Sequence, residues 1–404
     1  MVESYCTRNS VLKVFTCAYF MERKTLLKTL FTILVIFGIT TVLYLYTSGY
    51  RLQREEKIKI DFKKTGMLSI KSIPEGANIY FDGELTNATD TTIPGIEPGI
   101  HSLKISKTGY VDWEKDVEVF AELVTDITAV LVSGSPRLEP LTNTGAAQPI
   151  ISPSLNKLAY FSKDPLKPGV WVIPLNQGGL SLFKANPYIV IQDTQRNKYS
   201  GGTSIEWSPD EKKILVEDAN KLFYLVDLQI GVAQSTASPE KVRKEWSEEL
   251  TKKRNDFLER LEIPDDIRTV AIQPTTLWSP DDKKFLFTKV TGQETEYRVY
   301  NMEKPIPIGE KVDNLVFTLK KSDQQPKISW YYDSFHLILT SLDPEEKNRG
   351  TISIIRIDGT NKTEIYNNTM YSDNVYSGPG GDKLIMLTTF KSTGATNLYT
   401  LGIR

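Results

Sequence analysis

Histidine and cysteine are both scarce in this chain of 404 residues, which contains two of each. The histidines are His101 and His336, and so few imidazoles leave almost no room for a zinc cluster or a histidine-based catalytic site. Because Cys6 and Cys17 both lie near the start, residues 18–404 exclude a disulfide framework, an iron–sulfur site and a cysteine nucleophile. We therefore expect neither a metal site nor a cofactor.

An excess of basic charge is also lacking. Lys and Arg number 49 against 50 Asp and Glu, so the formal net charge is −1, and no basic tail is present to bind phosphates. We expect no nucleic-acid partner. Hydrophobic residues at 40% and charged residues at 25% are typical of globular proteins, and the length suits two or three domains.

Two common catalytic motifs are missing as well. The chain contains neither Gly-x-Ser-x-Gly, the turn that presents a hydrolase serine, nor Gly-x-x-x-x-Gly-Lys, the loop that binds nucleotide phosphates. We find no catalytic constellation and expect that the protein is not an enzyme.

Residues 29–50 form the one long uncharged run. At about 1.5 Å per residue this run can cross a hydrocarbon core of about 30 Å, and Tyr44, Tyr46 and Tyr50 suit the headgroup level at its end. A buried core helix is the alternative. No small-x-small cleavage triplet follows, so we expect an uncleaved, single-pass membrane anchor.

The basic residues next to this anchor hardly indicate its orientation, because three precede the span and three follow it. We place residues 1–28 in the cytoplasm and the C-terminal domains outside, since long folded domains are translocated largely regardless of charge and Glu55 and Glu56 offset the distal basic residues. Met21, which precedes an ordinary signal-anchor pattern, is an alternative start.

Beyond a charged linker at residues 51–65, residues 66–132 show strand-like alternation in five runs bounded by Gly, Pro and Asp: 67–73, 77–81, 101–107, 115–119 and 126–132. Asp82-Gly83 predicts a hairpin turn. Tyr110 and Trp113 are large enough to fill the core of a small β sandwich.

This segment resembles the PEGA domain family. The similarity rests on Pro74-Glu75-Gly76-Ala77, on Ile79-Tyr80-Phe81-Asp82-Gly83, on Pro98-Gly99 and on Lys107-Thr108-Gly109-Tyr110. The resemblance implies a non-catalytic module of the cell envelope. A ligand or ion site at Glu75 or Asp82 is the alternative to a structural role, and we expect His101 to be a surface or core residue.

An internal repeat organises residues 137–404. Ile151, Trp207, Trp278 and Trp330 are each followed by a Ser-Pro turn or its equivalent and by a further apolar strand, and a weaker fifth copy begins at Ser377. Another strand follows each copy, so we predict a β-propeller with five blades, six being the alternative. The Trp-Ser-Pro-Asp-x-Lys-Lys pattern resembles the TolB-like propellers, and a PEGA domain with such a propeller behind one anchor resembles a bacterial envelope architecture.

Two details of the propeller follow from this repeat. The strand at residues 137–142 should pair with residues 397–403 and thereby close the ring. His336 stands where the other copies have a basic residue, so we expect it to be a solvated turn residue. We also expect the lysines of the repeated turns to be exposed to water.

The longest spacing between copies predicts a helical insertion at residues 238–262. Ser238, Pro239 and Glu240 form a helix start, and Ile263-Pro264 forms a stop. An apolar stripe that includes Trp246, Leu250 and Phe257 either packs on the propeller or forms a docking face for a partner.

These observations leave two classes of function. We favour a membrane-anchored, non-catalytic binding or scaffolding protein of the cell envelope, whose partner is an envelope protein or a polysaccharide. The alternative is an envelope sensor or a glycan-acting enzyme with a carboxylate-based site in the propeller channel.

Overall fold

The computed structural model describes residues 28–44, 50–54, 60–175, 186–389 and 394–404. The chain divides into two compact units, each described by itself below. The first contains Met1–Ser69, Thr92–Ile100 and Glu118–Asp126, and the second contains Ile70–Thr91, His101–Val117 and Ile127–Arg404.

In the first unit, residues 28–44 form a helix, followed by the antiparallel strands β1 (Tyr50–Arg54) and β2 (Ile60–Lys64). Among the described residues, no helix is both long enough and apolar enough to span a membrane. The expected span at residues 29–50 is wrong at its end, because Tyr50 already belongs to β1, and residues 45–49 lie outside the described residues. The expected linker at residues 51–65 contains β2 and all of β1 except Tyr50. Apolar and polar residues alternate in both strands, and Leu52 pairs with Phe62.

Seven strands then form the predicted small β domain. They make one sheet in the order β6-β3-β9 and another in the order β5-β4-β7-β8. The strand bounds are β3 (Gly66–Ile73), β4 (Asn78–Phe81), β5 (Glu84–Ala88), β6 (Thr91–Ile96), β7 (Gly99–Ser106), β8 (Trp113–Val119) and β9 (Val124–Val130).

Local sequence explains most of this domain. The hairpin at Asp82-Gly83 is confirmed, because both residues have a positive φ, 49° and 85°, as a primed turn requires. Trp113 is buried, whereas Tyr110 is only half-buried. The sequence pattern missed β5 and β6, since β5 has no buried side chain and β6 contains Pro94 and Gly95.

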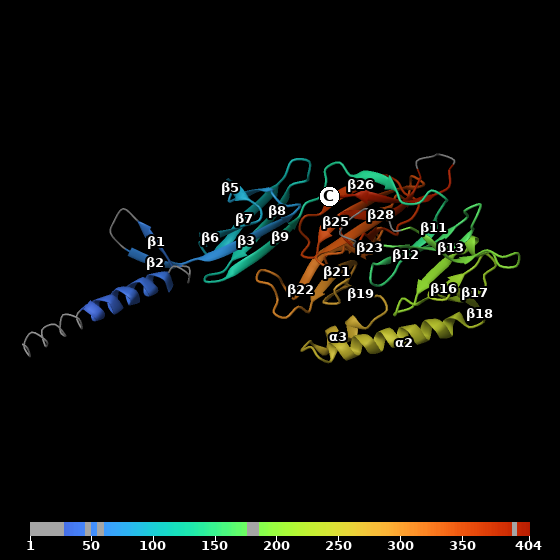
Figure 1. Ribbon diagram of the computed structural model, residues 1–404, viewed down its shortest axis with the longest axis horizontal. Coiled ribbons are helices and arrows are strands. Elements are labelled where there is room, and N and C mark those ends of the chain that lie inside the picture. Colours follow the sequence, from blue (N-terminus) through green and yellow to red (C-terminus); the bar gives the residue numbers. More distant parts are fainter. Residues whose placement is uncertain (1–27, 45–49, 55–59, 176–185, 390–393) are drawn as a thin grey trace, which may run out of the picture. The chain divides into compact units, whose positions relative to one another are not determined.

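The second unit contains the propeller, built in the described part of the chain from five four-stranded antiparallel sheets (Figure 1). The blades consist of β11 (Ala147–Ile151), β12 (Lys157–Ser162), β13 (Gly169–Pro174) and β14 (Tyr188–Gln192); β15 (Ser204–Trp207), β16 (Lys213–Glu217), β17 (Phe223–Asp227) and β18 (Val232–Thr236); β19 (Leu277–Trp278), β20 (Lys284–Thr291), β21 (Glu294–Asn301) and β22 (Asp313–Lys320); β23 (Lys327–Trp330), β24 (His336–Leu342), β25 (Arg349–Arg356) and β26 (Thr363–Thr369); and β27 (Tyr376–Ser377), β28 (Lys383–Thr388), β29 (Asn397–Gly402) and β10 (Arg137–Pro140).

The predicted closure of the ring is confirmed. The fifth sheet takes its outer strand from the other end of the propeller, because β10 pairs with β29 and places Leu138 opposite Leu401. This pairing gives β29 a partner on both sides, and therefore removes an exposed sheet edge.

The repeated turn has one geometry in all five blades. The fourth residue after the Ile, Trp or Ser that begins each copy has a positive φ, and this set is Leu155, Glu211, Asp282, Ser334 and Gly381. In each turn, the amide of this residue donates a hydrogen bond to the carbonyl three residues earlier, as Gly381 does to Gly378. The weak fifth copy is therefore a true repeat.

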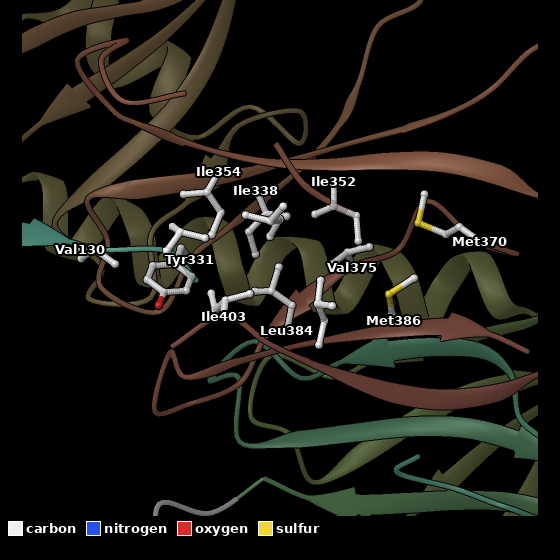
Figure 2. Close-up of a cluster of buried hydrophobic side chains, with 13 residues drawn as sticks. Val130, Tyr331, Ile338, Ile352, Ile354, Met370, Val375, Leu384, Met386 and Ile403 are labelled. Atoms are coloured by element: carbon white, nitrogen blue, oxygen red, sulfur yellow. The ribbon is translucent and has the colours of Figure 1, made fainter. Parts of the chain in front are cut away.

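Apolar clusters join neighbouring blades. Separate clusters pack the first blade on the second, the third on the fourth, the fourth on the fifth and the fifth on the first. Figure 2 shows the cluster between the fourth and fifth blades, where Ile338 and Ile352 face Leu384 and Met386. Burial of these side chains on both sheet faces accounts for the near-continuous apolar runs of the middle strands.

The second and third blades are joined differently. The helices α2 (Pro239–Leu258) and α3 (Asp265–Ala271) lie along one side of the propeller (Figure 1), and Leu258 and Ala271 pack on the third blade. The predicted helix is present but ends at Leu258, before the expected stop. The pattern missed α3, which begins directly after Pro264.

The hydrogen bonds of the repeat tryptophans show that the helices replace a contact between the second and third blades. The indoles of Trp207 and Trp330 donate to Ile150 and Leu277, at 3.2 and 2.9 Å, which are equivalent positions on the preceding blades. The Trp278 indole donates at 2.8 Å to Ala271 of α3 instead. The insertion thus takes the place of the second blade at this junction.

Candidate functional site

The three residues of the predicted partner face, Trp246, Leu250 and Phe257, all lie half-buried on α2. Phe257 packs at the edge of the cluster that joins the helices to the third blade, and its ring centroid lies 6.1 Å from that of Trp278. Phe257 therefore contributes to packing within the propeller. A docking role for Trp246, Leu250 and Phe257 stays a prediction.

His101 lies in β7 and contacts the predicted hairpin. Its Nδ1 is 2.8 Å from Asp82 Oδ2, and its ring stacks on Phe81 with a centroid separation of 4.8 Å. The hydrogen bond from His101 lowers the pKa of Asp82. These contacts hold the hairpin in place. Among the described residues, no group of three or more His, Cys, Asp or Glu side chains is arranged to hold a metal ion.

His336 is not the solvated turn residue that the repeat predicted. It is 3% exposed, and its Nδ1 lies 2.7 Å from Asp333 Oδ2. Burial opposes ionisation of Asp333, but His336 and two backbone amides outweigh it and keep the pKa of that carboxyl below its usual range. The buried Tyr331, which stands where the first three blades have a turn serine, meets the His336 ring edge-on and contributes to this burial.

The lysines of the repeat also differ from expectation. Lys213 is exposed, but Lys284, at the equivalent position of the third blade, is fully buried. Its Nζ lies 3.1 Å from Glu303 Oε1, 3.3 Å from Asp281 Oδ2 and 4.0 Å from the centroid of the Phe335 ring. Two carboxylates and an aromatic face compensate the buried ammonium.

A second buried cation lies in the fourth blade. The guanidinium of Arg356 bonds to Glu310 and Asp358, and the ammonium of Lys115 from β8 reaches Asp358 Oδ2 at 2.7 Å. Burial opposes ionisation of Asp358, but the charges of Arg356 and Lys115 prevail and hold its pKa well below the usual range. Each charge is neutralised within the fold, so these residues serve stability.

A cleft of about 340 Å³ lies where the ring closes. One wall is the segment after β10, including Asn143 and Thr144, and the other is the first blade, where Tyr160 and Trp171 are directly paired across β12 and β13. The Trp171 indole N–H donates to Lys167 at 3.1 Å, which fixes the ring. Because it combines aromatic and polar side chains, this cleft is a candidate binding site.

The polar groups of the cleft have unused hydrogen-bonding capacity. Tyr160 is 1% exposed and lines the cleft, yet among the described residues its hydroxyl has no hydrogen-bond partner. Asp164 Oδ1 accepts the amides of Leu166 and Lys167, at 2.8 and 3.3 Å, which orients the carboxylate. Burial and this carboxylate raise the pKa of Tyr160, so the hydroxyl remains a donor.

Sequence reasoning did not find this site. Its described residues come from the first blade and from a segment without a motif that follows β10. The pairing of β10 with β29 holds that segment at the closure of the ring. The alternation of β12 and β13 could have paired Tyr160 with Trp171, but it could not have placed Asn143 opposite them.

Among the described residues, the fold therefore comprises a small β domain with two sheets, followed by a propeller of five blades with a helical insertion. The β domain is a PEGA domain, because residues 65–135 match the PEGA domain family, as the sequence predicted.

Among solved structures, the chain is similar to TolB from Acinetobacter baumannii, with 13% identity and a TM-score of 0.27 over 75% of this chain and 59% of that one. A putative TolB from Agrobacterium tumefaciens matches at 15% identity and a TM-score of 0.25, over 67% of this chain and 92% of that one. An oligogalacturonate lyase in complex with manganese matches at 9% identity and a TM-score of 0.31, over 85% of this chain and 99% of that one.

The chain thus spans less than two thirds of the first of these structures. Such low identities and TM-scores establish neither an activity nor a ligand for this chain. No curated protein matches it.

Proposed function

We propose that this chain is a membrane-anchored, non-catalytic binding or scaffolding protein of the cell envelope, which displays its PEGA domain and its propeller outside the membrane. The observation that carries the proposal is the match of residues 65–135 to the PEGA domain, directly ahead of the closed propeller. The uncharged run at residues 29–50 supports an N-terminal anchor.

The polar residues of the repeat favour a binding role over a catalytic one, because their hydrogen bonds are made within the turns. Ser208 donates to Asp210 at 2.7 Å, and Ser279 makes the equivalent bond to Asp281. The repeat residues Asp281 and Lys284 also pair with each other. These residues stabilise blades, and the propeller surfaces remain for contact with partners.

A reporter fusion tests the location. Alkaline phosphatase fused after Arg404 folds only outside the cytoplasm, so we expect it to be active in cells that express the full chain. Deletion of residues 1–50 should abolish the activity, and the same deletion fused to a cytoplasmic reporter is the control. An inactive phosphatase on the full chain would contradict the proposed topology.

Recovery of the full chain from envelope fractions tests the binding role. We expect an envelope protein or a polysaccharide to be recovered with it. Turnover of a recovered polysaccharide by the purified chain would contradict the non-catalytic part of the proposal.

A further inference from the structure

We propose that the cleft at the closure of the propeller binds a neutral sugar ring of a polysaccharide. The inference rests on the proposed function and deepens it, because it assigns a class of ligand and a site to an envelope-binding protein. The cleft volume of about 340 Å³ lies in the range of small-ligand sites, which is about 300–1,000 Å³.

The first argument is the combination of an aromatic wall with polar groups. Trp171 and Tyr160 are neighbours across two strands, and Trp171 is half-buried with its indole N–H already bonded, so it offers chiefly an apolar ring to a ligand. A sugar ring has an apolar C–H face that fits such a surface and hydroxyls at its rim that need hydrogen bonds.

The second argument is the hydrogen-bonding capacity around this wall. Tyr160 is an almost fully buried residue that lines the cleft, and its hydroxyl has neither a donor nor an acceptor partner among the described residues. Asn143 is exposed and offers a donor and an acceptor, while Asp164 is held by two backbone amides through one oxygen, Oδ1. Sugar hydroxyls, which donate and accept, match this mixture.

The third argument is charge. The described lining includes one carboxylate, Asp164, and neither lysine nor arginine. An acidic sugar would be repelled by Asp164 and would find no cation in this lining. The charge pattern therefore favours a neutral ring over a uronate or a phosphate.

The site is also rigid. Tyr160 packs in the cluster that joins the first and fifth blades, and the loop opposite it is held by Asn397, which accepts hydrogen bonds from Thr142 and Gly145 at 3.2 and 3.0 Å. A preformed cleft loses little conformational entropy when it binds a ligand.

Calorimetric titration of the full chain tests the proposal. The probes are cellohexaose, maltohexaose and N-acetylchitohexaose as neutral chains, hexagalacturonic acid as an acidic chain, and decaproline, which is another ligand that aromatic grooves bind. We expect at least one neutral hexasaccharide to bind with a Kd of about 1 mM or tighter, and the acidic chain to bind at least about tenfold more weakly.

Two variants locate the binding. Trp171→Ala should weaken it about tenfold or more, and Tyr160→Phe, which keeps the buried ring and removes only the hydroxyl, should weaken it about three- to tenfold at an unchanged melting temperature. The controls are Lys252→Ala, an exposed change on α2, and Tyr188→Phe, an exposed tyrosine of β14, and both should bind as the native chain does.

The proposal is overturned if no neutral chain binds, if hexagalacturonic acid or decaproline alone binds, or if Tyr160→Phe and Trp171→Ala both retain native affinity. Such a failure would reject the sugar-binding site but would not affect the envelope location, which the phosphatase fusion tests. An inactive phosphatase fusion would instead reject the envelope location and leave the titration standing.

Discussion

Single residues in equivalent places of the repeat have different environments, and Lys284 shows how much this matters. Lys213 of the second blade is exposed, whereas Lys284 of the third blade is fully buried with Asp281, Glu303 and Phe335. The sequence places both at the same step after a tryptophan. The surroundings that bury Lys284 come from other segments of the third and fourth blades.

We predict that Lys284→Met lowers the free energy of unfolding by about 3–5 kcal/mol, because it leaves the carboxylate of Glu303 buried without its cation. Lys213→Met is the matched control and should change that free energy by no more than about 0.5 kcal/mol. Urea unfolding of the full chain measures both. Equal effects of the two variants would show that Lys284 is not buried as described.

The helices and the closure strand are the elements that distinguish this propeller. The insertion of α2 and α3 displaces the regular tryptophan contact between the second and third blades. Arg243 of α2 instead binds Glu206 of the second blade, with 2.7 Å between Nη2 and Oε1. The insertion therefore contacts both blades.

We expect Phe257→Ala to destabilise the full chain by about 2 kcal/mol, since it removes a half-buried ring from the junction with Trp278. Lys252→Ala, an exposed change on the same helix, is the control. Thermal unfolding followed by circular dichroism reports the difference. If Phe257→Ala melts like the control, α2 does not depend on this contact and the ring is free for a partner.

Ring closure can be tested with a cross-link, because residues 18–404 contain no cysteine. In a background with Cys6→Ser and Cys17→Ser, the pair Glu139→Cys and Thr400→Cys lies opposite in the β10–β29 ladder and should form a disulfide. The bond closes a very long loop and should raise the free energy of unfolding by roughly 4 kcal/mol. The mispaired control, Glu139→Cys with Thr363→Cys on β26, should remain reduced, and a cross-link in the control alone would contradict the closure.

At the scale of the whole molecule, buried ion pairs tie the stability of the second unit to pH. Asp358, between Arg356 and Lys115, and Asp333, beside His336, both have lowered pKa values in the folded chain. The unfolded chain therefore binds protons first as the pH falls, so the stabilisation is complete above about pH 4 and is lost below it.

We predict that the free energy of unfolding falls between about pH 4 and pH 2, with Asp358 contributing at most about 1.4 kcal/mol per pH unit. Asp358→Asn should be less stable at pH 7 and should show a shallower pH dependence in this window. Asp323→Asn, in the turn after β22, is the control and should retain the native slope. A native slope in Asp358→Asn would reject the role of this carboxyl.

The sequence by itself determined the β domain with its PEGA motif, the five repeats, the pairing of β10 with β29 and the start of α2. Those features depend on turn chemistry and on apolar periodicity, which act over a few residues. The tertiary structure alone decided the burial of His336 and Lys284, the packing of Phe257 and the cleft between Tyr160, Trp171 and Asn143. The physical reason is that burial depends on what packs from distant segments, and the same residue pattern meets a different neighbour in each blade.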